Sequence, residues 1–170
     1  KDVDSLRKGF TNEKETPVYT RGNNPTVEIL RKKVAALAGA EDALVFSSGV
    51  AAISAAVIGN VKAGDHVVCV GKPYGWTEKL FNLFLPRFGV TATFIDGTNP
   101  QHFIDATTPA TKVYFLESPN TFTFELQDIP AVVKIAKERG ILTIIDNSYC
   151  TSIGQKCIEM GVDIGVDSAK

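Results

Sequence analysis

The sequence has little of what disulfide-bonded, metal-binding and nucleic-acid-binding proteins depend on. Its 170 residues include three cysteines, an odd number, and no Cys-x-x-Cys pair. Neither a disulfide framework nor a zinc site is therefore expected, and a reducing compartment, the cytoplasm, fits best. The net charge of −1 gives no reason to expect nucleic acid or a membrane surface as a partner. No apolar run is long enough to span a bilayer.

The sequence also has few histidines, and it lacks the glycine motif of nucleotide-binding folds where that motif would be expected. His66 begins an expected strand and His102 stands in a weak helical pattern, so neither has the partners of a catalytic dyad, and no metal site is expected. No Gly-x-Gly-x-x-Gly follows the first expected strand, which argues against a Rossmann nucleotide-binding module. The chain shows no secretory signal and begins at Lys1 without Met, so we expect an upstream piece.

What is present is an alternation of apolar runs and helical patterns. At 44% hydrophobic and 22% charged residues, the composition suits one domain with a proper core. Strands are expected at 43–46, 66–70, 90–95, 112–116, 141–145 and 162–166. Helices are expected from Asn24-Pro25 to Gly39, and at 50–58, 80–85, 99–108, 129–139 and 153–160. Residues 1–18 are polar with little periodicity and are interpreted as an arm. This order predicts an α/β fold, a mostly parallel sheet with helices on both faces.

The run from Ile141 to Tyr149 is the centre of the functional prediction. Its β-branched, apolar residues are typical of a buried parallel strand, and the strand ends on Asp146. Apolar flanks desolvate a carboxylate there, so it should have a cationic partner. Ligands of open α/β sheets bind beyond the carboxyl ends of the strands. The plain alternative is an Asp that caps a helix and has no chemical role.

Polar groups with complementary chemistry follow the other expected strands. Ser47-Ser48-Gly49 opens a helix, where free N–H groups and the helix dipole favour an anion. Lys170 follows the last strand, where burial would favour the neutral amine that attacks carbonyls; an exposed chain end is the alternative. Pyridoxal phosphate (PLP) needs a lysine for its aldehyde, an acid for its pyridine nitrogen and an anion cradle for its phosphate. Tyr74 would supply an aromatic plate for the ring.

With these motifs the chain resembles the Cys/Met-metabolism PLP-dependent enzymes. This family includes cystathionine γ-synthase, cystathionine β- and γ-lyases, methionine γ-lyase and O-acetylhomoserine sulfhydrylase. The resemblance runs from Tyr19 to Lys170. The matching segments are Tyr19-Thr20-Arg21 with Asn24-Pro25-Thr26, Phe46-Ser47-Ser48-Gly49, Tyr74-Gly75, Leu116-Glu117-Ser118-Pro119, Asp146-Asn147-Ser148-Tyr149 and Ser168-Ala169-Lys170.

The resemblance implies a fold and a role for each motif. The fold would be the large domain of the aspartate aminotransferase-like PLP-dependent transferases, with the chain truncated: residues 1–25 as an arm that contacts a neighbouring subunit, residues 26–170 as the PLP-binding domain, and the C-terminal domain absent. Asp146 would pair with the pyridine nitrogen, Tyr74 would stack on the ring, and Lys170 would bind the aldehyde. The remaining cofactor contacts would be Ser48, Gly49, Val50, Glu117 and Ser168, with Tyr19 and Arg21 reaching the phosphate of a neighbouring subunit.

The chain departs from the family pattern at three places. It has Asn120-Thr121-Phe122 where the family has Thr-Asn-Pro, and Asp167 where the family has His. Lys170 also stands one position closer to Asp146 than in the family. The resemblance implies a homotetrameric enzyme, a dimer of dimers, which acts on cystathionine, methionine or activated homoserine by β- or γ-elimination or γ-replacement. The alternative is a non-catalytic fragment or degenerate homologue that keeps only the subunit interface.

Overall fold

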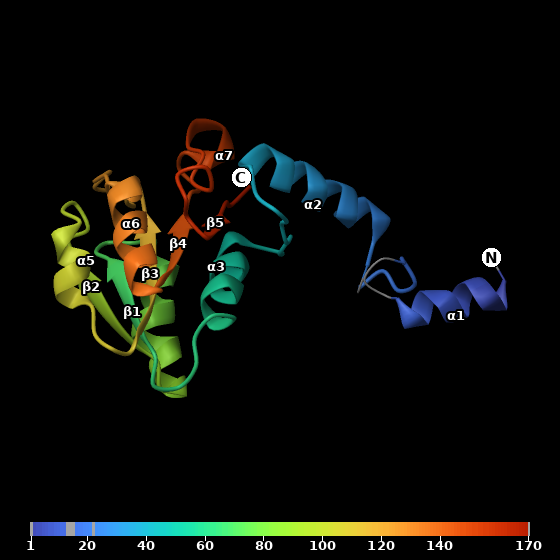
Figure 1. Cartoon of the computed structure of the whole chain (residues 1–170), viewed down its shortest axis with the longest axis horizontal. Coiled ribbons are helices and arrows are strands. Elements are labelled where there is room, and N and C mark those ends of the chain that lie inside the picture. The colour runs from blue at the N-terminus through green and yellow to red at the C-terminus, as the bar shows by residue number, and fades with distance from the viewer. Residues whose placement is uncertain (1, 13–15, 22, 170) are drawn as a thin grey trace. The chain divides into compact units, whose positions relative to one another are not determined.

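The structure, a computed structural model, describes residues 2–12, 16–21 and 23–169 (Figure 1). The chain divides into two compact units, Lys1–Val45 and Phe46–Lys170. The functional division into an arm of residues 1–25 and a cofactor domain of residues 26–170 stays a prediction. In the part of the chain that is described, no helix is long and apolar enough to cross a membrane.

The first unit contains two helices, α1 (Val3–Thr11) and α2 (Pro25–Ala38). The start of α2 confirms the prediction, because the Asn24 side chain accepts hydrogen bonds from the N–H groups of Thr26 and Val27, and Pro25 is the first helical residue. Gly39 ends this helix in the left-handed conformation, φ 71°.

The helix α1 was not predicted within the polar arm. The Asp2 side chain accepts a hydrogen bond of 2.7 Å from the Ser5 N–H and so caps the helix. Val3, Leu6 and Phe10 follow at helical spacing, and all three are more than half exposed. Capping and this short apolar stripe therefore favour a helix that the overall polarity of the segment conceals.

The second unit is built on a sheet of five strands, all parallel, in the order β2-β1-β3-β4-β5. The strands are β1 (His66–Val70), β2 (Thr91–Ile95), β3 (Thr111–Glu117), β4 (Leu142–Asp146) and β5 (Ile164–Val166). The predicted α/β class with a parallel sheet is confirmed. The predicted strand at 43–46 is wrong, since these residues adopt no regular structure and no strand of the described residues pairs with them. High β-propensity alone does not make a strand without a hydrogen-bonded neighbour.

Helices cover both faces of the sheet, as predicted (Figure 1). The side chains of β1 alternate between the two cores: Val68 and Val70 pack with α5 (Gln101–Ala106) and α6 (Ile129–Arg139), whereas Val67 and Cys69 pack with α3 (Gly49–Ile58). The second core also receives the segment after β1, in which α4 (Gly75–Lys79) continues as a π-helical turn (Leu80–Phe84) and a 3-10 turn (Leu85–Phe88). The central strands β1, β3 and β4 are therefore largely buried, which explains their apolar sequences.

The predicted helix at 153–160 is largely wrong. The structure has a short helix, α7 (Thr151–Gly154), and Gln155 then turns to an extended conformation. The Gln155 side chain donates to the Asn147 side chain at 2.9 Å and to the Ser118 carbonyl at 3.1 Å. Asn147 donates in return to the Gln155 carbonyl at 3.1 Å. These hydrogen bonds hold Gln155 in a non-helical conformation, so the segment does not form the helix that its apolar spacing predicts.

Candidate active site

A pocket of about 760 Å³ opens where the carboxyl ends of the central strands meet. This volume lies within the range of small-molecule sites. All of its lining residues belong to the second unit: Ser48, Gly49, Val50, Ile53, Tyr74, Gly75, Trp76, Lys79, Glu117, Thr121, Phe122, Asp146, Ser148, Tyr149 and Ser168. The position follows the general rule for ligand sites in open α/β sheets.

Two carboxylates, Glu117 and Asp146, lie side by side in this pocket. They are register partners at the ends of β3 and β4, and both are buried. Burial raises the pKa of the Glu117 carboxyl; hydrogen bonds from Thr121 and the Tyr74 N–H oppose the shift, and the Asp146 charge adds to it. The two carboxylates thus differ in the hydrogen bonds that they accept from neighbouring residues of the protein.

Asp146 lies at the end of β4, as predicted, and is buried there. Its Oδ1 accepts a hydrogen bond of 3.0 Å from the Ser148 N–H. Among the residues that the structure describes, no lysine or arginine forms an ion pair with it. A buried carboxylate that lines a pocket without a cationic partner suits a cationic ligand group, such as a protonated ring nitrogen.

The N-terminus of α3, where the sequence predicts an anion cradle, lies on the same pocket. The Ser48 hydroxyl accepts a 3.1 Å bond from the Ala51 N–H and caps the helix. The N–H groups of Gly49 and Val50 precede the first intrahelical hydrogen bond, so no helical carbonyl is available to them. A Cβ at Gly49 would lie 2.8 Å from the Ser168 Oγ. The absence of a Cβ at Gly49 therefore allows α3 and Ser168 to approach closely at the pocket.

Tyr74 lies at the pocket at the end of the turn after β1. Its N–H donates a 2.7 Å hydrogen bond to Glu117 Oε2. Its carbonyl accepts bonds from the Thr77 and Glu78 N–H groups at the start of α4. The main chain of Tyr74 is thus held on both sides, while its side chain remains 36% exposed at the pocket, as a stacking plate requires.

The departures from the family pattern have clear structural outcomes. Thr121 lines the pocket, and its N–H donates a 2.7 Å bond to Glu117 Oε1. Asn120 is buried outside the pocket lining and donates from its side chain to the Gly71 carbonyl at 2.6 Å. Asp167 accepts a 2.7 Å bond from the Ser152 hydroxyl. Thr121, and not Asn120, is therefore the residue of this pair that can meet a ligand.

The pocket brings together most of the predicted site residues: Ser48, Gly49, Val50, Tyr74, Glu117, Asp146 and Ser168. Tyr19 and Arg21 belong to the other unit, where the Arg21 guanidinium lies 5.2 Å from the centre of the Tyr19 ring. Lys170 lies outside the described residues. The roles assigned to all these residues stay predictions.

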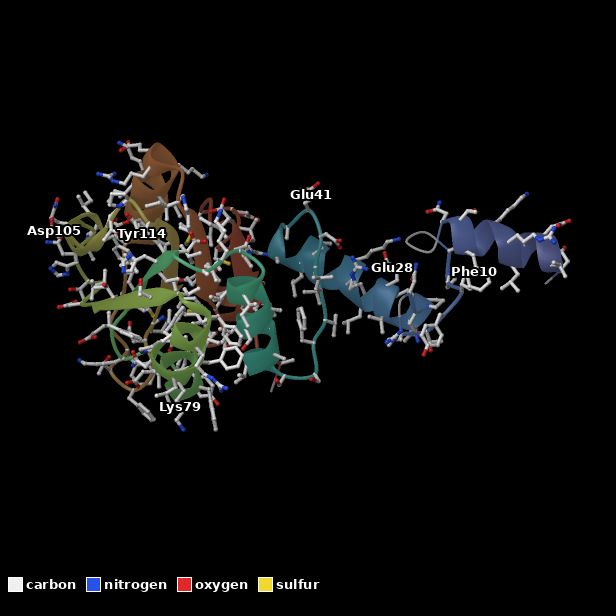
Figure 2. The ribbon with its side chains drawn as sticks, turned by 90° about the horizontal axis from the view of Figure 1, so that it is seen from below. Phe10, Glu28, Glu41, Lys79, Asp105 and Tyr114 are labelled. Atoms are coloured by element: carbon white, nitrogen blue, oxygen red, sulfur yellow. The ribbon has the colours of Figure 1, made fainter. Side chains whose placement is uncertain are left out.

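Some pocket residues were not singled out from the sequence. Lys79, labelled in Figure 2, lies one helical turn after Gly75 and has its ammonium 4.1 Å from the centre of the Trp76 ring. Phe122 is 87% exposed at the pocket and has a left-handed backbone, φ 63°. The helical spacing from Gly75 could have indicated Lys79. No sequence pattern could have indicated Phe122, because its position depends on the conformation of a loop.

Comparison with known proteins identifies one family to which the chain is similar. The family model for Cys/Met metabolism PLP-dependent enzymes matches residues 2–170. A cystathionine β-lyase of Bacillus subtilis is 40% identical over 89% of this chain and 38% of its own length. An L-methionine γ-lyase of Fusobacterium nucleatum is 41% identical over 98% of this chain and 43% of its own. An O-succinylhomoserine sulfhydrylase of Pseudomonas aeruginosa is 37% identical over 94% and 40%. The chain therefore spans less than half the length of these relatives.

Proposed function

Because the chain belongs to the family of Cys/Met-metabolism PLP-dependent enzymes, we propose that its pocket is the cofactor side of an active site for sulfur amino acids or activated homoserine esters. The family depends on PLP, and the pocket residues fit that cofactor. The observation that carries the proposal is the convergence on one pocket of a buried acid, Asp146, which forms no ion pair within the described part of the chain, with the helix N-terminus at Gly49 and the aromatic ring of Tyr74.

Each residue of the pocket has a proposed task. When bound, PLP supplies an electron sink for the carbanion at the α-carbon of an amino acid. The Asp146 carboxylate would keep a proton on the pyridine nitrogen. The N–H groups of Gly49 and Val50 would bind the phosphate together with the hydroxyls of Ser48 and Ser168, which the 2.8 Å approach at Gly49 brings close.

Two further tasks complete the proposed reaction. The Tyr74 ring would keep the cofactor ring in one plane, and Glu117 would hold the Tyr74 main chain through the 2.7 Å hydrogen bond. Lys170 would bind the cofactor aldehyde and, once the substrate amine has displaced it, take the α-proton. A group on the β-carbon could then leave, whereas departure of a group on the γ-carbon would first need a second proton to be taken from the β-carbon. The β- and γ-reactions share removal of the α-proton, so the proposed residue roles are compatible with both.

The relatives suggest the reactions to test, since they are lyases for cystathionine and methionine and a sulfhydrylase. We propose a homo-oligomer, a dimer of dimers, as its assembly. The three free thiols, Cys69, Cys150 and Cys157, favour the cytoplasm as its location. The alternative is a non-catalytic homologue that keeps the subunit interface; the shifted position of Lys170 favours it.

The test uses the full-length protein with PLP and three separate substrates. L-cystathionine, L-methionine, and O-acetyl-L-homoserine with sulfide are supplied in turn, and keto acid and thiol products are measured. We expect a yellow protein with one preferred substrate. Borohydride reduction followed by peptide mapping should place the cofactor on Lys170. A yellow protein that releases no product would favour the non-catalytic alternative, and label on a distant lysine would contradict the role of Lys170.

A further inference from the structure

The turn that carries Tyr74 contains an unfavourable backbone conformation and depends on contacts from other parts of the chain. Between β1 and α4 the chain passes through Gly71, Lys72 and Pro73. Lys72 adopts the left-handed conformation, φ 52°, which is unfavourable for a residue with a Cβ. Such backbone persists only where surrounding contacts over-determine it. The direction of the Tyr74 ring at the pocket therefore depends on what holds this turn.

One of those contacts comes from Asn120. Its side-chain Nδ2 donates to the Gly71 carbonyl at 2.6 Å, and Asn120 is only 2% exposed. A carbonyl can only accept, so the amide nitrogen, and not the oxygen, must face Gly71. Gln127 fixes that orientation, because its Nε2 donates to Asn120 Oδ1 at 2.6 Å. Gln127 is itself buried, and its N–H donates to the Ser118 hydroxyl at 3.0 Å.

The same segment holds the other end of the turn. Glu117, three residues before Asn120, accepts the Tyr74 N–H at 2.7 Å. Lys72 and Glu125 add an exposed ion pair of 3.3 Å, which contributes little on its own. The first and last residues of the turn, Gly71 and Tyr74, are thus both bound by one stretch of chain. That stretch begins at the last residue of β3 and continues into the loop after it.

We propose that Asn120, oriented by Gln127, is a positioning residue for Tyr74: it holds the Gly71 carbonyl and so fixes where the Tyr74 ring meets the cofactor. Asn120 itself does not line the pocket, and Thr121 does. The order Asn120-Thr121 therefore separates two tasks, one at the turn and one at the pocket. The inference rests on the proposed function only for the contact between Tyr74 and PLP.

The experiment is a double-mutant cycle in the full-length protein, with the dissociation constant of PLP and its visible circular dichroism as readouts. The variants are Asn120→Ala, Tyr74→Ala and the two combined. Asn120→Ala removes a side-chain donor from the partly buried Gly71 carbonyl, so PLP affinity should fall about fivefold or more. In the Tyr74→Ala background the same substitution should have no further effect, because the residue through which it acts is gone.

Two controls separate positioning from general damage. In a Ser48→Ala background, which alters the anion cradle, the penalty of Asn120→Ala should persist. Asn60→Ala removes an exposed 2.8 Å bond from the Asn60 side chain to the Ala56 carbonyl, a contact of the same kind away from the pocket, and should leave PLP affinity and dichroism unchanged. If Asn120→Ala fails to fold, Gln127→Met replaces it in the cycle, since it frees the Asn120 side chain to rotate.

The outcomes distinguish the inference from the proposed function. Wild-type protein that binds no PLP would overturn both. Wild-type protein that binds PLP, with Asn120→Ala or its Gln127→Met replacement at wild-type affinity, would overturn only the positioning role. A penalty of equal size with and without Tyr74 would also overturn it, because Asn120 would then act on the pocket by another route.

Discussion

At the scale of single residues, the neighbouring carboxylates of Glu117 and Asp146 illustrate how surroundings divide two similar groups. Glu117 accepts hydrogen bonds from the Tyr74 N–H and from both the N–H and the hydroxyl of Thr121. Asp146 accepts from the Ser148 N–H. Hydrogen bonds within the protein thus occupy the Glu117 carboxylate, whereas the Asp146 carboxylate can still accept a hydrogen bond from a ligand. The sequence alone shows only that each acid ends a strand.

Replacement of Asp146 by Asn tests that division. Asp146→Asn is isosteric and can still accept from the Ser148 N–H, so the fold should persist. The charge-assisted bond to a protonated ring nitrogen would be lost, which is worth about 1.5–3 kcal/mol, or roughly ten- to hundredfold in turnover of the full-length enzyme. The control is Asp105→Asn on the exposed face of α5 (Figure 2), which should keep wild-type turnover. Wild-type turnover in Asp146→Asn would contradict the role.

A methyl group at Gly49 tests the anion cradle. In Gly49→Ala the new Cβ would lie 2.8 Å from both Cβ and Oγ of Ser168, so α3 and the chain after β5 must separate. Overpacking of this kind costs about 1–3 kcal/mol, and we expect it mainly as weaker PLP binding, measured by titration. Gly154→Ala places its Cβ 3.8 Å from Cys150, an ordinary contact, and should bind PLP normally. Equal affinity in the two variants would exclude a cradle at Gly49.

At the scale of elements, strand ends could be predicted from the sequence and loop contacts could not. The strands that end on Glu117 and Asp146 are apolar runs bounded by polar residues, and both end as predicted. The strand at 43–46 has the same composition but no partner, and the helix at 153–160 yields to the bonds between Asn147 and Gln155. Periodicity records which residues are buried; it holds no information on which side chains meet across two loops, as Asn120 and Gly71 do.

The sheet also has a polar contact at the end opposite the pocket. His66, the first residue of β1, is buried and joins its neighbours through Nδ1 to the Thr111 hydroxyl at 2.8 Å and Nε2 to the Thr93 hydroxyl at 2.9 Å. Burial lowers the pKa of His66 below its ordinary value of 6.5. A protonated ring would have to donate from both nitrogens and carry its charge into the sheet.

His66 therefore predicts a loss of stability in mild acid. Well above pH 6.5 the histidine is neutral in both the folded and the unfolded chain, so it adds no pH dependence there. Below that value the unfolded chain binds the proton first, and the free energy of unfolding falls until the pH passes the lower pKa of the folded state. Unfolding measured between about pH 7.5 and 5 should show this loss. His66→Gln should flatten the curve; a wild-type slope in His66→Gln would be evidence against it.

At the scale of the whole molecule, the proposed assembly assigns a task to the first unit. Tyr19 and Arg21 lie together there, with the guanidinium 5.2 Å from the ring centre. An arginine suits bidentate phosphate contact, and a tyrosine hydroxyl can add one bond. We propose that they complete the phosphate site of a neighbouring subunit in a symmetric dimer. A surface arginine without such a task is the alternative.

Mixed dimers test this shared site. Arg21→Ala and Lys170→Ala should each inactivate the full-length enzyme, and a dimer that contains one of each should regain activity, because one of its two sites keeps both residues. The matched control combines Asp146→Asn with Lys170→Ala. These residues are proposed to serve the same subunit, so neither site of that mixed dimer is intact, and its activity should not rise above the residual activity of Asp146→Asn. Verified mixed dimers of Arg21→Ala and Lys170→Ala without activity would count against the shared site.

The parallel order of the sheet has a consequence for how the protein and its cofactor stabilise each other. No two neighbouring strands of the described sheet form a hairpin, so the pocket residues from Ser48 to Ser168 meet only after contacts between distant parts of the chain have formed. A ligand that touches both ends of that stretch acts as a reversible cross-link. By mass action it adds about 2.7 kcal/mol to the stability of the folded state when its free concentration is about a hundred times its dissociation constant. Cofactor supply would then set not only the activity of the protein but also its lifetime against unfolding and proteolysis.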